Sequence, residues 1–196
     1  KYLNAERSLS QGQLTITWIV YAAAGVGSIA GGWLSGYLIK RGALPASSRL
    51  WVMSGCAVLV AISPLISRVA GTNTAIALTI VAVIAALAWL INISSLIVDV
   101  VPKHSLGTVF SVVAAGSTVG GILMNTLVAF MVAGPSTKPA GFLDQALQTV
   151  FGPVLSLVQG QGYGLWFLIM AFLQPLALLV LWGGGVHRTR STVASA

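Results

Sequence analysis

The stretch from Leu14 to Ile39 contains no charged side chain, and this feature constrains the fold more than any other. As a helix rising about 1.5 Å per residue, its roughly 26 residues would extend about 39 Å, which exceeds the about 30 Å hydrocarbon core of a bilayer. Lys40, Arg41 and Arg49 follow this stretch. Because cytoplasmic loops of membrane proteins are enriched in Lys and Arg, the junction predicts a transmembrane helix that ends at the cytoplasmic face.

The composition extends this prediction to the whole chain. Hydrophobic residues make up 57% of the sequence and charged residues only 7%, against about 25% charged residues in a typical soluble domain. The formal net charge of +7 could suggest a nucleic-acid partner, but the ten basic residues are scattered over loops and ends and form no basic stripe. The predicted partner is therefore the lipid bilayer and not nucleic acid.

Five apolar segments predict an all-α, polytopic transmembrane helix bundle. Four of these spans lie within residues 14–133, at about 14–39, 50–67, 74–98 and 107–131, and the fifth occupies 163–183. We expect residues 1–13 to form an external loop and residues 184–196 a cytoplasmic tail. Residues 134–162 contain three prolines and an amphipathic run, which predicts an external loop with an interfacial helix.

Local signals refine the boundaries of the spans. Pro45 is expected inside a turn at 42–48, and Pro102 is expected to stop the third span because helical geometry is disfavoured before a proline. Small residues recur in the first and fourth spans, which predicts close packing between these two helices. The lone Cys56 lies within a hydrophobic segment and is expected to act as a small buried hydrophobe.

The distribution of basic residues assigns an orientation. With five crossings, six basic residues lie on one side and four on the other, and the larger group contains the tight basic turn, so we place it in the cytoplasm. The six are Lys40, Arg41, Arg49, Lys103, Arg188 and Arg190, against Lys1, Arg7, Arg68 and Lys138. An odd number of spans with an external amino end, and a chain that opens on Lys1, predict that a preceding portion of the protein is missing here.

Several segments resemble a known family of transporters. Gly-Trp-Leu-Ser-Gly-Tyr-Leu-Ile-Lys-Arg-Gly at 32–42 resembles the loop signature that follows the eighth helix in the major facilitator superfamily. Asp-Val-Val-Pro-Lys at 99–103, with the segments 107–111 and 116–121, is similar to the region of the tenth and eleventh helices in the anion:cation symporter family. Residues 1–10 look like the end of the seventh helix and its external loop in the hexuronate transporter branch of that family.

The resemblance implies a fold and an activity. Residues 14–183 would be helices eight to twelve of a twelve-helix carrier, whose two halves hold the substrate between them and rock to alternate access. Members of this branch take up sugar acids together with protons, so the implied partners are a small organic anion, protons and the missing N-terminal half. The implied location is the cell inner membrane. Gly36 departs from the pattern, because the signature commonly has an acidic residue there, and the 134–162 segment looks longer than usual.

Polar residues inside the spans are candidates for substrate binding. Trp89, Asn92 and Asp99 share one helical face with Ser95. Asn92 either lines the substrate cavity or makes a structural hydrogen bond to a neighbouring helix, and Trp89 either lines the cavity or is a packed or lipid-facing aromatic. Ser117 and Asn125 on the fourth span either line the cavity or contribute to close helix packing, and Tyr21 either reaches the ligand or lies in an interfacial aromatic belt.

The two turn segments are candidates for gating. Gly36, Lys40, Arg41, Asp99 and Lys103 make up this set. For Asp99, we favour a salt bridge with Lys40, Arg41 or Arg49 over a solvated helix end or a proton carrier, because it lies at the end of its span.

Enzyme chemistry and cofactor binding are not predicted. One cysteine, two distant histidines and three acidic residues assemble neither a nucleophile with its base nor a metal site. The alternative to a transporter is a non-transporting membrane subunit or assembly module, which the small-residue faces would also suit.

Overall fold

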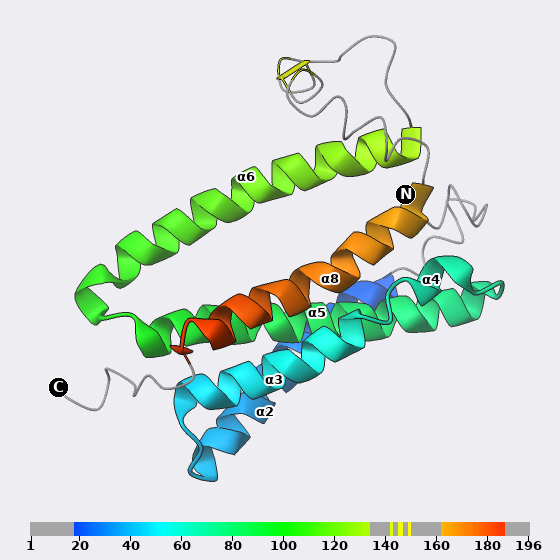
Figure 1. Ribbon diagram of the computed structural model, residues 1–196. Helices are drawn as coiled ribbons and strands as arrows, with labels where there is room; N and C mark the ends of the chain where they lie inside the picture. Colours follow the sequence, from blue (N-terminus) through cyan, green and yellow to red (C-terminus); the bar gives the residue numbers. More distant parts are fainter. Residues whose placement is uncertain (1–17, 134–141, 143–144, 147–148, 150–161, 187–196) are drawn as a thin grey trace.

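The computed structural model describes residues 18–133, 142, 145–146, 149 and 162–186, and within these residues it contains helices and no strand (Figure 1). The predicted features at 1–13 and 187–196, and most of those at 134–162, lie outside the described residues. The elements are α2 (Trp18–Lys40), α3 (Pro45–Val60), α4 (Leu65–Arg68), α5 (Thr72–Val100), the 3₁₀ turn η2 (Lys103–Ser105), α6 (Leu106–Ala133) and α8 (Gly162–Gly183).

Among the described residues, five helical segments are long and apolar enough to cross a membrane: α2, α3 with α4, α5, η2 with α6, and α8. Successive long helices run in alternating directions (Figure 1). The C-terminal ends of α2 and α5 and the N-terminal ends of α3 and α6 therefore lie at the same end of the molecule. The expected all-helical architecture, with five apolar helices of membrane-spanning length, is thereby confirmed for the described residues.

The connection between α2 and α3 is tighter than the sequence suggested. Gly42 has a φ of 94°, and the amide of Ala43 donates to the Leu38 carbonyl oxygen at 3.2 Å, which is the hydrogen bond of a Schellman helix end. The prediction that Pro45 lies inside a turn was wrong, because Pro45 is the first residue of α3. A proline fits there since the first helical residues have no intrahelical acceptor for their N–H groups.

The other boundaries follow from prolines. Around Pro64, which has no N–H, backbone amides donate to the carbonyl oxygen three residues earlier, as in a 3₁₀ helix. The Ser63 amide, for example, donates to the Val60 carbonyl oxygen at 2.9 Å. This change of hydrogen-bond pattern separates α3 from α4. α5 ends at Val100, and Val101 before Pro102 is extended with a ψ of 134°. This stop is the one predicted from the residue-before-proline rule.

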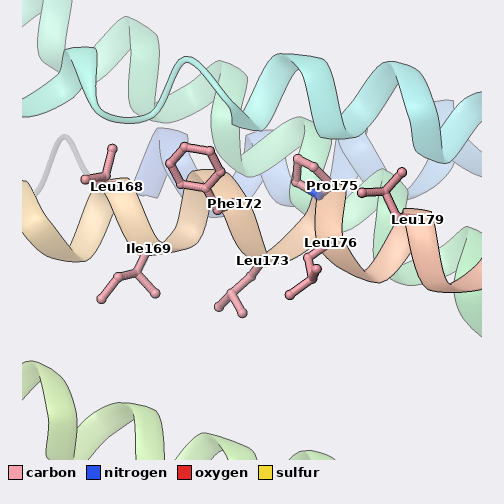
Figure 2. Close-up of a pocket in the computed structure, with 7 residues that line it drawn as sticks. All are labelled: Leu168, Ile169, Phe172, Leu173, Pro175, Leu176 and Leu179. Atoms are coloured by element: carbon pink, nitrogen blue, oxygen red, sulfur yellow. The ribbon is translucent and has the colours of Figure 1, made fainter. Parts of the chain in front are cut away.

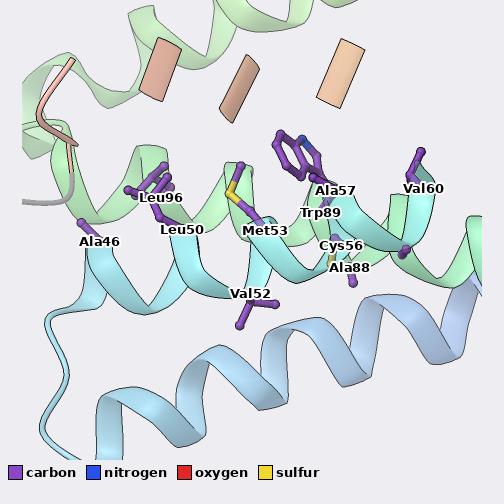
Figure 3. Packing of buried hydrophobic residues seen from close by; sticks show 11 residues of the cluster. Ala46, Leu50, Val52, Met53, Cys56, Ala57, Val60, Ala88, Trp89 and Leu96 are labelled. Carbon is purple, nitrogen blue, oxygen red and sulfur yellow. The ribbon is translucent and has the colours of Figure 1, made fainter. Parts of the chain in front are cut away.

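α5 is the centre of the packed part of the molecule, with α2 on one side and α3 on another. Figure 3 shows the cluster of buried side chains between α3 and α5, in which Leu50 and Met53 of α3 are fully buried and Trp89 of α5 is 8% exposed. Cys56 lies in this cluster at 6% exposure.

α6 is arranged differently from the sequence expectation. It has few contacts with α8 and α5 and runs apart from the packed helices over most of its length, whereas α2 packs on α5 and α3 (Figure 1). The predicted close packing of the first and fourth spans was therefore wrong. Small residues allow a close approach of two backbones but do not specify the partner. Residues 111–119 of α6 are all exposed.

Candidate functional site

Three helices are joined by polar contacts at the end where α2 stops, α3 starts and α5 stops. We call this the basic end, after Lys40, Arg41, Arg49 and Lys103. Arg49 of α3 donates from Nε to Oδ2 of Asp99 at the end of α5, at 2.9 Å. The same guanidinium donates from Nη1 to the Ser35 Oγ of α2, also at 2.9 Å. Arg49 of α3 thus connects α2, which precedes it in the sequence, with α5, which follows it.

The Arg49–Asp99 ion pair is shielded from solvent over most of its surface. The side chains are 15% and 18% exposed, respectively. Loss of either partner would leave a mostly buried charge without its counter-charge, which destabilises a fold far more than loss of a surface pair does. Ser35, which is fully buried, helps to hold the guanidinium in place.

The polar contacts continue from the ion pair into the apolar interior. The Ser35 hydroxyl donates to the carbonyl oxygens of Gly31 at 3.2 Å and Gly32 at 3.1 Å. The Gly31 carbonyl also accepts a hydrogen bond of 3.0 Å from Nδ2 of Asn92, across the α2–α5 interface. Asp99, Arg49, Ser35, Gly31 and Asn92 therefore form one connected chain of interactions, which we call the polar chain.

Glycines allow the hydrogen bond between α2 and α5 in the polar chain to form. A Cβ added at Gly31 would lie 2.6 Å from both Cα and Cβ of Ala88, and one added at Gly27 would collide with the backbone of Ile84. The two helix backbones are in contact at these positions, which brings the Gly31 carbonyl within reach of Asn92. The Asn92 amide also donates to Ala88 at 2.8 Å, while its Oδ1 is buried with no partner among the described residues.

The candidate substrate-binding residues do not come together in one site. Asn92 is fully buried between α2 and α5, and Trp89 lies in the α3–α5 cluster. Ser117 and Asn125 are exposed on α6, where the Ser117 hydroxyl donates to its own helix at Ala114. Tyr21 of α2 is 79% exposed. Substrate binding by these five residues stays a prediction.

The candidate gating residues all lie at the basic end, but only Asp99 takes part in the polar chain. Lys40, Arg41 and Lys103 are exposed, and Gly36 has no atom within 4 Å of where a Cβ would be. Of the three cations considered as partners of Asp99, the structure places Arg49 against it.

Sequence reasoning missed Ser35 and Gly31 as polar members of the site. Both lie in the small-residue stripe of α2, where such residues indicate helix packing alone. The available signal was the four-residue spacing of Gly27, Gly31 and Ser35, which places all three on one helical face.

A groove along α8 does not suit an anion. Its lining side chains are apolar and point to both sides of the helix (Figure 2): Leu168, Ile169, Phe172, Leu173, Pro175, Leu176 and Leu179. None of them can donate a hydrogen bond from its side chain. No group of three metal-binding side chains occurs among the described residues.

Comparison of the chain with models of protein families, with curated proteins and with solved structures finds no match.

Proposed function

We propose that the chain is the C-terminal portion of a secondary active transporter of the major facilitator type, with α2, α3–α4, α5, α6 and α8 as helices eight to twelve. Its substrate is a sugar acid such as a hexuronate, or a related organic anion, carried together with protons. The basic end faces the cytoplasm of a plasma or inner membrane, as the excess of Lys and Arg favours.

One observation supports the proposal above the others. The two segments on which the resemblance rests, 32–42 and 99–103, are far apart in sequence yet lie at the same end of the molecule. Ser35 in the first segment and Asp99 in the second are linked through Arg49, at 2.9 Å on each side. Two loop signatures that work together in gating would need such a physical connection.

The arrangement suggests how the parts divide the work. α2, α3 and α5 are held together by the polar chain and by backbone contact, so they are suited to move as one body during alternating access. The exposed polar side chains of Ser117 and Asn125 on α6 would face the substrate path or the other half of the carrier. No charged residue lies in the middle of a described span, so we assign the substrate's cationic partner and the proton-carrying carboxylate to the N-terminal half.

The test is uptake of radiolabelled glucuronate and galacturonate by cells that express the complete gene containing this sequence. An inward proton gradient should drive uptake. Asp99→Arg should abolish it, and adding Arg49→Asp should restore at least part of it by reversing the ion pair. Arg68→Gln, which removes an exposed cation at the opposite end of the helices, is the matched control. Absence of uptake in well-expressing cells at every pH and for both acids would refute the proposal.

A non-transporting membrane subunit is the second candidate, and the exposure of residues 111–119 on α6 favours it. Small and polar residues on an exposed face of a membrane helix suit a protein partner better than lipid. The two candidates differ in one outcome. Only a subunit would co-purify with a separately encoded membrane protein and show no uptake without it.

A further inference from the structure

An aromatic and cationic ladder runs along the exposed face of α2 toward the basic end. The rings of Trp33 and Tyr37 are stacked, with centroids 5.7 Å apart and planes 15° from parallel. The Arg41 guanidinium lies over the Tyr37 ring, with its Cζ 4.5 Å from the ring centroid. The spacing of four residues between members places all three on one side of the helix.

Lys40 directly precedes Arg41, and we include it in the ladder. These two cations have no anionic partner among the described residues. Asp99 is the one carboxylate in the described part of the chain, and it is bound to Arg49. Gly36, one turn before Lys40, contributes no charge, although there is open space for a side chain at this position. Lys40 and Arg41 are both exposed. The ladder therefore presents two uncompensated positive charges.

The ladder also spans the depth at which a bilayer changes from apolar to polar. Eight residues separate Trp33 from Arg41, which is about 12 Å along the helix axis. Trp33 is 67% exposed, and Ile29, one turn further from the basic end, is 76% exposed. An exposed apolar surface that continues into an aromatic pair and then into cations matches the order of acyl chain, interface and headgroup.

We propose that Trp33, Tyr37, Lys40 and Arg41 form a binding site for an anionic phospholipid, with the headgroup phosphate at the two cations and the acyl chain along Trp33 and Ile29. Tyr37 holds the Arg41 guanidinium through a cation–π contact and so orders it for the phosphate. A soluble phosphate compound shares the headgroup chemistry, but it would leave the exposed Trp33 surface uncovered. This is the reason to assign the site to a lipid.

The test is native mass spectrometry of the full chain in a neutral detergent, titrated with phosphatidylglycerol or phosphatidylcholine of the same acyl chains. Each basic residue near an anionic surface contributes about a fivefold gain in binding. We expect phosphatidylglycerol to bind at least tenfold more tightly than phosphatidylcholine. Arg41→Gln should weaken phosphatidylglycerol about fivefold, and Lys40→Gln with Arg41→Gln about 25-fold. Equal binding of the two lipids by the unmodified chain would overturn the proposal.

Matched variants separate this site from general charge effects. Arg68→Gln also removes one exposed cation, and it should change the preference by less than twofold. Gly36→Asp should weaken phosphatidylglycerol, because it adds a carboxylate one turn before Lys40. If Arg68→Gln weakens binding as much as Arg41→Gln does, the preference comes from net charge and the proposed site is refuted.

Two further measurements identify the ligand and its position. Glycerol 3-phosphate at the same concentration should not displace phosphatidylglycerol, and displacement would assign the site to a soluble phosphate compound instead. Brominated phosphatidylglycerol should quench more tryptophan fluorescence in the unmodified chain than in Trp33→Phe, because Trp33 would contact its acyl chain. Equal quenching in the two proteins would contradict the lipid position.

Discussion

Replacing Gly31 by alanine should destabilise the helix bundle by an amount that the structure allows us to work out. The added Cβ would lie 2.6 Å from Cα and Cβ of Ala88. Ordinary contact between such atoms is about 3.6 Å or more, so α2 and α5 must separate by about 1 Å. The 3.0 Å hydrogen bond from Asn92 to the Gly31 carbonyl would then lengthen to about 4 Å, which is too long for a hydrogen bond.

Two costs add in this variant. Overpacking of a tight interface costs about 1 to 3 kcal/mol. An interhelical hydrogen bond within a membrane protein contributes about 0.6 kcal/mol on average and at most about 1.7. We therefore expect Gly31→Ala to lower the free energy of unfolding by about 2 to 4 kcal/mol. For a chain of this size, that is a fall in Tm of roughly 5 to 15 °C.

The single cysteine provides the assay. Cys56 is the only thiol in the chain, and it is buried at 6% exposure between α3 and α5. A maleimide dye that fluoresces on reaction with the thiol will report unfolding in detergent as the temperature rises. Gly36→Ala is the matched control, because no atom lies within 4 Å of its added Cβ. In a helix interior, that control is expected to be neutral or slightly stabilising.

The comparison of the two alanine variants decides the matter. If Gly31→Ala exposes Cys56 at the same temperature as the unmodified chain, the backbone contact between α2 and α5 does not exist in the protein. A fall in Tm for both variants would show instead that glycine is required along all of α2 for a reason other than this contact.

Three further predictions concern the polar chain and its surroundings. Asn92→Leu removes the interhelical hydrogen bond while keeping a side chain of similar size, so the dye should report a loss of about 0.6 to 1.7 kcal/mol. Asp99→Asn should cost about 2 to 3 kcal/mol in the same assay, less than the 3 to 5 kcal/mol of a fully buried pair, because Arg49 keeps some contact with solvent. Asp99→Arg alone should also lower stability, and adding Arg49→Asp should recover at least half of the loss that Asp99→Arg causes; no recovery would argue against a direct pair. Gly42→Ala should cost about 1 to 2 kcal/mol, since a φ of 94° is unfavourable for any residue with a Cβ, and an unchanged Tm would contradict the helix end described for α2.

The sequence predicted the helices well because the bilayer leaves few alternatives. An apolar segment that crosses a membrane must satisfy its backbone hydrogen bonds internally, and a single helix does so. The stop at Pro102 was predictable for a similar local reason. Pro45 was placed wrongly because a proline is compatible both with a turn and with the first position of a helix, and the sequence alone does not distinguish the two.

The contacts between helices were much less predictable. Lys40, Arg41 and Arg49 were all possible partners of Asp99, and the choice among them depends on how far each helix is rotated about its axis. In the sequence, Ser35 is indistinguishable from the other small residues of its helix. Its role as acceptor of a hydrogen bond from Arg49 depends on the tight turn that brings α3 back against α2. The partner of α6 was predicted wrongly, since a stripe of small residues carries no information about which helix it meets.

α2 serves two purposes on two different faces, and this division follows from its four-residue periodicities. Gly27 and Gly31 contact α5, and the buried Ser35 accepts a hydrogen bond from Arg49 of α3. Trp33 and Tyr37 are offset from these residues by about half a turn and remain exposed. The polar chain and the aromatic ladder therefore share no side chain. A lipid bound at the ladder would act on α2 without competing for Arg49 or Asp99. Its influence on the basic end would arise from a shift of the whole α2–α5 pair, because backbone contact at two glycines leaves the helices little freedom to move separately.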